Sequence, residues 1–308
     1  MVHQRLKVGS YCEEVQKLRP YEWMIEYTPQ TEWIKGRGIL VWLAFFFVEL
    51  GAGAFFISSI FGSLLGMFFG WLICAVLGGG FHLIYLGHPL RSWRILISSG
   101  WKTSWISRGL YFVSFFLVLG LIHMILTQWA SPSLGLLIAA DIFGFLTVMY
   151  GGFAMNYVSS IQLWNSGLLP VLFGIAGFWG GAGLTLLTMA ISSATSIAVF
   201  EEWIWTFLVS YVLLVTIYLL SATYRGRAGK YSVREIVKER WSLLFWIGVV
   251  GLGMVLPLGV TIHFLIVGFA GVPLTLLYIS IIFELLGDLS LRYCIFRSSY
   301  YSPLVSYY

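Results

Sequence analysis

Ionisable side chains are rare in the apolar stretches of this 308-residue chain, so those that occur there carry its candidate chemistry. Within the apolar runs they are Glu49, His82, His123, Asp141, His263, Glu284 and Asp288. Such groups are costly in hydrocarbon and usually face the interior of a helix bundle or a water-filled cavity. Their positions are therefore the first candidates for a functional site.

Five polar residues fall in one half of the membrane when depth is counted along the helices that hold them: His82, Tyr150, Asn156, Asp288 and Arg292. In an aromatic setting this set suits a quinone head group, which needs hydrogen-bond donors for its carbonyls and a route for protons. The alternative is that these groups only pair with one another across helices. Depth alone favours that alternative.

Four acidic residues are spread over the depth of the bundle: Glu49, Asp141, Glu284 and Asp288. Such a series can relay protons, and structural hydrogen bonding between helices explains it equally well. Glu49 and Glu284, near the midplane, also fit an alternative function, a stand-alone secondary transporter.

Metal chemistry is not expected in this chain. The three cysteines Cys12, Cys74 and Cys294 are isolated, with no Cys-x-x-Cys pair for an iron–sulfur cluster or a thiolate zinc site. His123 and His263 lie toward the opposite membrane face and could in principle ligate a haem. Two ordinary histidines are the better reading of that pair.

The composition defines the elements that position these residues. Hydrophobic residues make up 59% and charged residues 10% of the chain, against about 25% charged residues in soluble domains. A membrane helix needs about 20 apolar residues, and the long runs do not alternate as barrel strands do. We therefore predict an all-α integral membrane protein with eight transmembrane helices. The predicted spans are 38–60, 64–86, 109–127, 133–157, 167–190, 203–222, 242–267 and 273–291.

The basic residues predict the topology. All 18 lysines and arginines fall in the N-terminal arm, in the connections after the second and sixth spans, or after the last span. With eight spans these regions share one side, which the positive-inside rule makes cytoplasmic, with both termini inside a cell membrane. This placement gives no case for nucleic acid. The predicted parts are a polar arm (1–37), an eight-helix membrane domain (38–297) and a tail (298–308).

A possible internal repeat predicts two packed four-helix bundles. Gly51-Ala52-Gly53 in the first span and Gly181-Ala182-Gly183 in the fifth are 130 residues apart, and both spans start from the basic side. The alternative is that small residues simply let helices approach closely.

The loop after the second span combines arginine with tryptophan, serine and glycine, in the stretches Gly87–Arg94 and Ser104–Gly109. Pro89 ends the helix before it. The loop is either an interfacial belt or a surface that docks a partner and grips an anionic or carbonyl ligand with Arg91 or Arg108.

These motifs resemble the NrfD/polysulfide reductase membrane-subunit family, which is related to the membrane anchor of dimethyl sulfoxide reductase. Leu86-Gly87-His88-Pro89-Leu90-Arg91-Ser92-Trp93 is similar to the family's Gly-x-Pro-x-Arg-x-aromatic signature, and Ser104-Trp105-Ile106-Ser107 to its Ser-Trp-x-Ser motif. Glu49-Leu50-Gly51-Ala52-Gly53, Tyr150-Gly151-Gly152, Trp164 and Pro170-Val171-Leu172-Phe173 are similar to further family patterns. The resemblance runs from about Gln30 to Arg292, and the order of the motifs makes it specific.

The resemblance implies a membrane anchor and quinone-reactive subunit of a multi-subunit oxidoreductase, with no catalytic metal in this chain. It implies quinone or menaquinone bound here, and iron–sulfur clusters and molybdopterin in a ferredoxin-like subunit and a catalytic subunit. Tyr150 matches the family's quinone-contacting tyrosine, and Gly87, Arg91 and Trp93 belong to the motif near the quinol site. Asn156 and Arg108 complete the candidate binding residues.

Two departures leave the proton acceptor open among His82, Glu49 and Asp288. Tyr85 stands where the dimethyl sulfoxide reductase anchor has a histidine, and Gly109 where it has a glutamate. If the loop after the second span marks the docking face, the partner subunits lie on the cytoplasmic side.

Overall fold

The computed structural model describes residues 26–97, 99–191, 197–267 and 273–303, and these are almost entirely helical. Most of the predicted arm 1–37, with Cys12, and residues 304–308 of the predicted tail lie outside the described residues. Serine side chains begin several of the helices. Ser63, Ser104 and Ser133 each precede a long apolar run and accept a hydrogen bond from a backbone N–H of the first turn.

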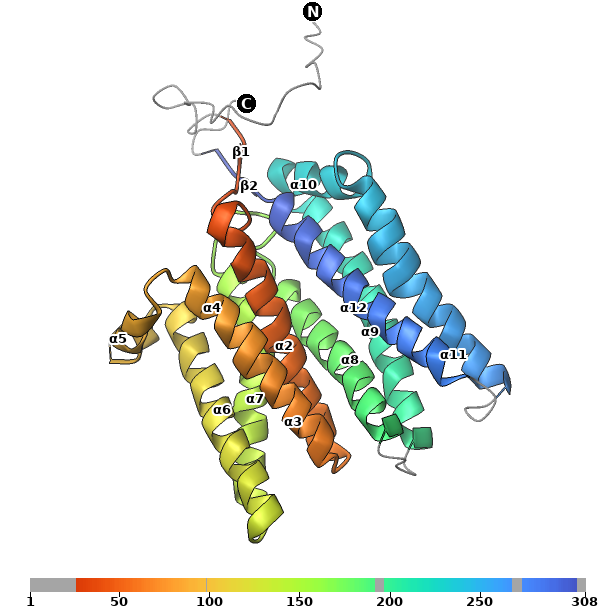
Figure 1. Cartoon of the computed structure of the whole chain (residues 1–308). Coiled ribbons are helices and arrows are strands. Elements are labelled where there is room, and N and C mark those ends of the chain that lie inside the picture. Colours follow the sequence, from red (N-terminus) through yellow and green to blue (C-terminus); the bar gives the residue numbers. More distant parts are fainter. Residues whose placement is uncertain (1–25, 98, 192–196, 268–272, 304–308) are drawn as a thin grey trace, which may run out of the picture.

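The first half of the chain forms four helical columns that run alternately away from and toward one end of the molecule (Figure 1). They are α2 (Ile39–Ile60), the continuous column α3 (Leu64–Leu72), η2 (Ile73–Gly78) and α4 (Gly79–Tyr85), then α6 (Trp105–Trp129) and α7 (Leu134–Asn156). Short helices join them at that end: η1 (Gly36–Gly38), η3 (Pro89–Arg91), α5 (Trp93–Ile97) and η4 (Ser99–Lys102).

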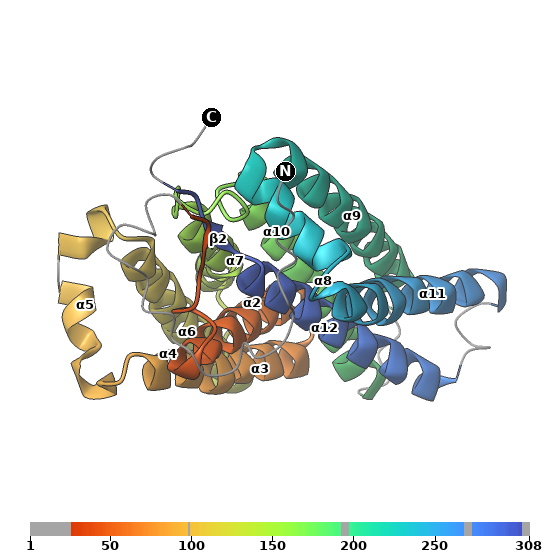
Figure 2. The same cartoon turned by 90° about the horizontal axis from the view of Figure 1, so that it is seen from above.

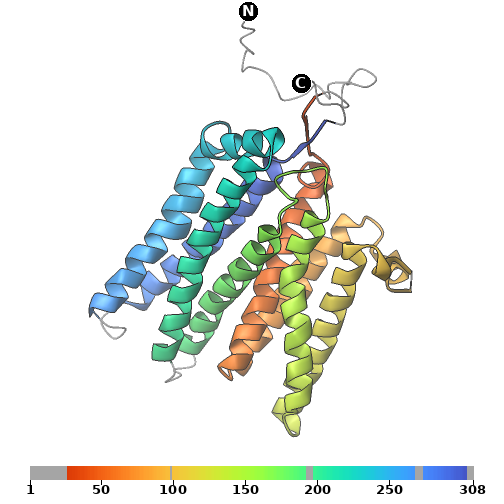
Figure 3. The ribbon, with the colours of Figure 1, turned by 180° about the vertical axis from the view of Figure 1, so that it is seen from behind.

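The second half repeats this up-and-down pattern beside the first, as Figure 3 shows from behind. Its columns are α8 (Leu168–Ile191), α9 (Ile197–Tyr224), η5 (Leu244–Val255) continued by α11 (Leu256–Val267), and α12 (Leu274–Arg297). Neighbouring helices pack on one another within each half, here called the first and the second bundle, and α8 packs extensively on both α2 and α7 across the halves. The two halves thus share one continuous helix packing.

The number of membrane spans differs from the predicted eight. Among the described residues, seven helices are long and apolar enough to cross a membrane. They are Gly36–Ile60, Leu64–Tyr85, Trp105–Trp129, Leu134–Asn156, Leu168–Ile191, Trp203–Tyr224 and Leu244–Phe264. The predicted eighth span, 273–291, corresponds to α12, a 24-residue helix that does not meet the same criterion. Glu284, Asp288 and Arg292 make this helix the most polar of the long ones.

The end of α12 corrects the reading of Arg292 as a basic residue that follows the last span. The helix continues to Arg297, so Arg292 lies within it, and its side chain is only 1% exposed. Arg292 therefore contributes to the interior of the bundle and not to the basic face.

Glycines allow the close contact between the two bundles. A side chain at Gly53 of α2 would overlap the backbone of Gly177 in α8, and one at Gly181 would overlap the backbone of Gly53. Thr185 of α8 adds hydrogen bonds across this contact, to Ser58 at 2.8 Å and to the carbonyl oxygen of Ala54 at 3.4 Å. Both Gly-Ala-Gly segments thus lie at one helix crossing, where small residues are needed for close approach.

The loops that carry the basic residues gather at one end of the molecule, where α5 and α10 (Arg227–Val237) lie (Figure 2). Strands β1 (Thr28–Pro29) and β2 (Tyr300–Tyr301) pair antiparallel at the same end. The hydroxyl of Tyr300 donates a 2.7 Å hydrogen bond to Glu235 of α10. This cap joins the beginning and the end of the described chain on the basic face.

The cap is expected to weaken as pH rises. Burial raises the pKa of Glu235 above its ordinary value of 4.5, so the folded state favours the protonated carboxyl. Its stabilising contribution is complete below 4.5 and is lost as pH rises through the raised pKa. Thermal unfolding of the detergent-solubilised chain should show Glu235→Gln gaining stability over the wild type with increasing pH. A pH-independent difference would contradict this, and Glu26→Gln, at an exposed position, is the control.

Candidate functional site

His82 of α4 and Tyr150 of α7 form a hydrogen-bonded pair. The Nε2 atom of His82 lies 3.0 Å from the Tyr150 hydroxyl, and its Nδ1 atom lies 3.0 Å from the carbonyl oxygen of Gly78. A carbonyl oxygen only accepts, so Nδ1 carries a hydrogen. In the neutral imidazole Nε2 is then the acceptor, and the Tyr150 hydroxyl donates to it. The two side chains can therefore pass a proton between them.

A π-helical segment precedes His82. The π-helix η2 ends at Gly78, and α-helical structure resumes at Gly79, so the ring of His82 reaches back to the last carbonyl of the wider segment. Short π segments within α-helices are often found at functional sites. Here the segment sets the direction in which the imidazole points.

Aromatic packing and a glycine hold Tyr150 in place. Phe45 of α2 contacts the Tyr150 ring edge-on, with centroids 5.4 Å apart, and lies 5.7 Å from the His82 ring. On the other side, a side chain at Gly109 of α6 would overlap the Tyr150 ring. Tyr150 occupies the space beside position 109, so any larger residue there would displace its ring.

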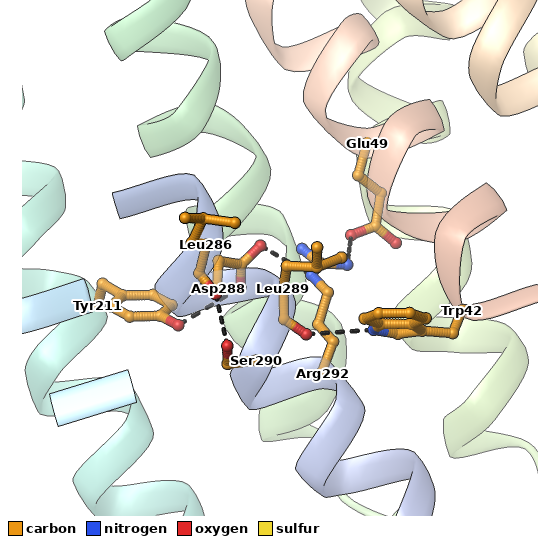
Figure 4. Close-up of polar contacts among 8 residues, drawn as sticks. All are labelled: Trp42, Glu49, Tyr211, Leu286, Asp288, Leu289, Ser290 and Arg292. Carbon is orange, nitrogen blue, oxygen red and sulfur yellow. Dashed lines mark hydrogen bonds and ion pairs between the residues drawn. The ribbon is translucent and has the colours of Figure 1, made fainter. Parts of the chain in front are cut away.

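A second polar cluster joins Glu49, Asp288 and Arg292 (Figure 4). Arg292 donates through Nη1 to Glu49 of α2 and through Nε to Asp288, at 2.8 Å. Tyr211 of α9 donates to the other Asp288 oxygen at 3.4 Å, and the Arg292 guanidinium lies 4.3 Å above the centroid of the Phe173 ring. Glu49 is 0% and Arg292 1% exposed, so this ion array connects three helices inside the protein.

The two clusters approach each other at α7. Oε1 of Glu49 has no hydrogen-bond partner among the described residues, and a side chain at Gly151, directly after Tyr150, would overlap that oxygen. Glu49 therefore lies between the Arg292 array and the helix that carries Tyr150. The predicted catalytic residues thus fall into two neighbouring clusters. His82 and Tyr150 form one, and Glu49 and Asp288 belong to the other, where both contact Arg292.

Among the predicted binding residues of the loop, Gly87 is needed for the backbone turn, whereas Arg91 and Trp93 are exposed. Gly87 has a φ of +71°, and a side chain there would come within 2.9 Å of the Arg37 guanidinium. Arg91 is exposed, and Trp93 is 54% exposed. Both are available at the surface of the basic face.

Arg108 donates hydrogen bonds to backbone carbonyls of the same loop. Its Nε donates to the carbonyl oxygen of Trp101 at 2.9 Å and its Nη2 to that of Lys102 at 2.6 Å. Its guanidinium lies 4.8 Å from the centroid of the Trp105 ring. Asn156 ends α7, six residues after Tyr150 and so about 9 Å further along the helix. The structure does not bring Arg108 or Asn156 against the His82–Tyr150 pair.

Glu49 and Glu284, the two acidic residues of the alternative transporter hypothesis, do not form a common site. Glu49 is paired with Arg292, whereas Glu284 lines a separate cavity in the second bundle. The two histidines considered for haem belong to helices at opposite edges of the molecule, His123 to α6 and His263 to α11 (Figures 1 and 3).

Two members of the site were missed by sequence reasoning. Tyr211 and Phe45 belong to long apolar runs, and nothing in their spacing marks them. The pairing of Asp288 with Arg292 was open to detection, because their separation of four residues places them on one helix face.

The chain is similar to proteins of a known family. A family model described as "Polysulphide reductase, NrfD" matches residues 33–303, which confirms the resemblance found in the motifs. The chain is also similar to "Protein NrfD" of Escherichia coli (strain K12), with 30% identity over 148 residues, 46% of each chain. The chain thus spans about half the length of the curated relative it matches.

Proposed function

Because the chain belongs to the NrfD polysulphide reductase family, we propose that it is the membrane subunit that exchanges electrons between the quinone pool and an iron–sulfur subunit. Family membership makes it a membrane subunit of a redox complex. The quinone, menaquinone included, the ferredoxin-like subunit and a molybdopterin catalytic subunit are the finer parts of the proposal.

The hydrogen-bonded pair of His82 and Tyr150 is the observation that carries the quinone assignment. A quinone supplies two-electron, two-proton chemistry at its ring oxygens, so its site needs a hydrogen-bond donor and a proton acceptor side by side. A quinol hydroxyl can donate to the Tyr150 oxygen, whose own hydrogen is donated to His82 Nε2, so a proton released by the quinol can pass through Tyr150 to His82. Phe45 closes the inner side of the pair against the bundle.

Glu49 would receive protons from this pair. Its Oε1 atom lies beside Gly151, the residue after Tyr150 in α7, and has no hydrogen-bond partner among the described residues. Its other carboxylate oxygen is bonded to Arg292. Asp288 shares Arg292 and extends the array to Tyr211. In this proposal the Arg292 array acts as a proton buffer behind the quinone site.

The basic face is the proposed docking surface for the iron–sulfur subunit. It carries Arg91 and Trp93 on the loop that follows α4, the helix of His82. By the positive-inside rule this face is cytoplasmic. We propose that both termini lie on this side, where β1 and β2 pair.

The proposal is tested with Tyr150→Phe in the assembled complex. We expect quinol-linked turnover to fall about 100-fold, since general acid–base groups contribute roughly 100- to 10,000-fold. Copurification of the partner subunits should be unchanged, because the ring and its contacts remain. Tyr157→Phe, at an exposed position just beyond α7, is the matched control. Normal turnover in Tyr150→Phe would remove this tyrosine from the quinone site.

A further inference from the structure

The second bundle contains a cavity that the proposed quinone site does not use. It has a volume of about 40 Å³ and lies among α8, α9, α11 and α12. A buried space needs only about 10–15 Å³ of this kind to hold a water molecule if polar partners are present. Its walls are mostly apolar, and its polar side chains are Trp179, Thr261, Ser280 and Glu284.

Glu284 is the chemically active member of this wall. The residue is 5% exposed, and its Oε1 atom has no hydrogen-bond partner in the described part of the chain. Oε1 lies beside Gly183 of α8, since a side chain there would be in van der Waals contact with it at 3.6 Å. An unpaired buried carboxylate is very costly, so the carboxyl is stable here either protonated or solvated by water in the cavity.

The charges around Glu284 also require bound protons. Asp288 lies one helical turn away on α12, and Arg292 pairs with both Asp288 and Glu49. Three buried carboxyl groups therefore lie near one guanidinium, which contacts only Glu49 and Asp288, and full ionisation would leave a net charge of −2 inside the bundle. The other titratable group of the cluster is Tyr211 of α9, which donates to Asp288. Neutrality is reached only when protons are held on these carboxyls.

The cavity lies on the side of Glu284 away from the basic face. Glu284 is about 20 Å along α12 from Arg297 at the basic end, and the cavity residue Leu277 is about 30 Å from it. Toward the basic face, a narrower space is lined by Glu284, Asp288 and Arg292. Glu284 thus stands between the cavity and the buried ion array.

We propose that Glu284 is a proton-exchange site served by water in this cavity. The carboxyl gives its proton to a water molecule, which leaves as hydronium, and takes a proton back by the reverse step. No electron moves, and no quinone is needed. Ser280 and Thr261 supply the hydroxyl groups that hold the water near the carboxyl, and Thr261 Oγ1 remains an acceptor while donating to the Pro257 carbonyl oxygen at 2.6 Å.

Infrared spectroscopy of the full-length chain in detergent, without quinone or partners, tests the proposal. A protonated carboxyl has a carbonyl stretching band that shifts when H2O is replaced by D2O. We expect Glu284→Gln to lose such a band. Asp141→Asn is the control, because Asp141 is a carboxyl of the other bundle that accepts from Ser59 at 2.9 Å. The two variants should remove different bands.

The role of the cavity is tested by Ser280→Val, which fills part of the space and removes a hydroxyl group. We expect the Glu284 band to remain and its shift in D2O to become slower, with thermal stability close to that of the wild type. Exchange as fast as in the wild type would overturn the proposal, as would a Glu284→Gln spectrum that loses no band. Loss of the band on addition of Na⁺ would replace the proton with a metal cation. If Glu284→Gln fails to fold, Ser280→Val and Thr261→Val decide.

Discussion

Arg292→Met is expected to lower the free energy of unfolding by about 3–5 kcal/mol, the usual cost of removing one partner from a buried ion pair. The guanidinium is 1% exposed and holds Glu49 of α2 and Asp288 of α12 together. Without it, two carboxyls remain inside the bundle with no cation. Methionine keeps much of the volume, so the loss reports the charge and not a cavity. Unfolding in mixed micelles gives the measurement.

Two comparisons separate the pairing from general damage. Combining Arg292→Met with Glu49→Gln and Asp288→Asn removes all three charges and should recover most of the stability, because neutral replacements of a buried ion array are often tolerated. Arg234→Met breaks the 2.7 Å pair with Glu239, whose side chains are 66% and 36% exposed. That change should cost at most about 1 kcal/mol. Equal losses in Arg292→Met and Arg234→Met would mean that the buried array does not stabilise the fold.

The helices and their order could be predicted from sequence because both depend on properties that a segment carries by itself. Long apolar runs must form helices in lipid, since every backbone polar group has to be paired within the segment. Alternation of basic and uncharged connections then gave the up-and-down order that the structure has. The count of eight was wrong, because α12 carries Glu284, Asp288 and Arg292 and is not among the seven candidate spans of the described residues.

The sequence gives the position of each site residue along its helix, but it does not give the direction in which the side chain points around the helix axis. Counting along helices placed His82, Tyr150, Asp288 and Arg292 in one half of the membrane, and the structure divides them into two clusters. Which residues meet depends on how each helix is turned about its axis. The π-helical segments η2 and η5 change that rotation within a column, and nothing in the apolar runs of the sequence marks them.

The same limit applies to residues whose contacts the sequence does not show. Arg108 reads as a ligand-binding arginine in a motif, and its Nε and Nη2 atoms donate to backbone carbonyls of its own loop. Tyr211 reads as one more aromatic residue in an apolar helix, yet its hydroxyl lies on Asp288. The partner of Tyr211 is fixed by tertiary packing, which the local sequence does not encode, whereas the partners of Arg108 depend on how its own loop folds.

Gly109→Ala is expected to reduce quinol-linked turnover at least as strongly as Tyr150→Phe, although position 109 contacts no ligand in the proposed mechanism. The added methyl group would overlap the Tyr150 ring, so the ring must move away from α6. Phe45 packs at right angles to the Tyr150 ring, with centroids 5.4 Å apart, and restricts how far the ring can move. The hydroxyl then leaves hydrogen-bond distance of His82 Nε2, which is 3.0 Å in the wild type. Small displacements of this kind are known to cost about 100-fold in rate.

Gly80→Ala is the matched control for this effect. Gly80 lies in α4 two residues before His82, and a side chain there would meet nothing within 4 Å. Alanine is the better helix former by about 1 kcal/mol, so Gly80→Ala should keep both turnover and stability. Wild-type turnover in Gly109→Ala would mean that Tyr150 can shift without loss of function. Its hydroxyl would then not orient the quinone, and His82 would have to do so alone.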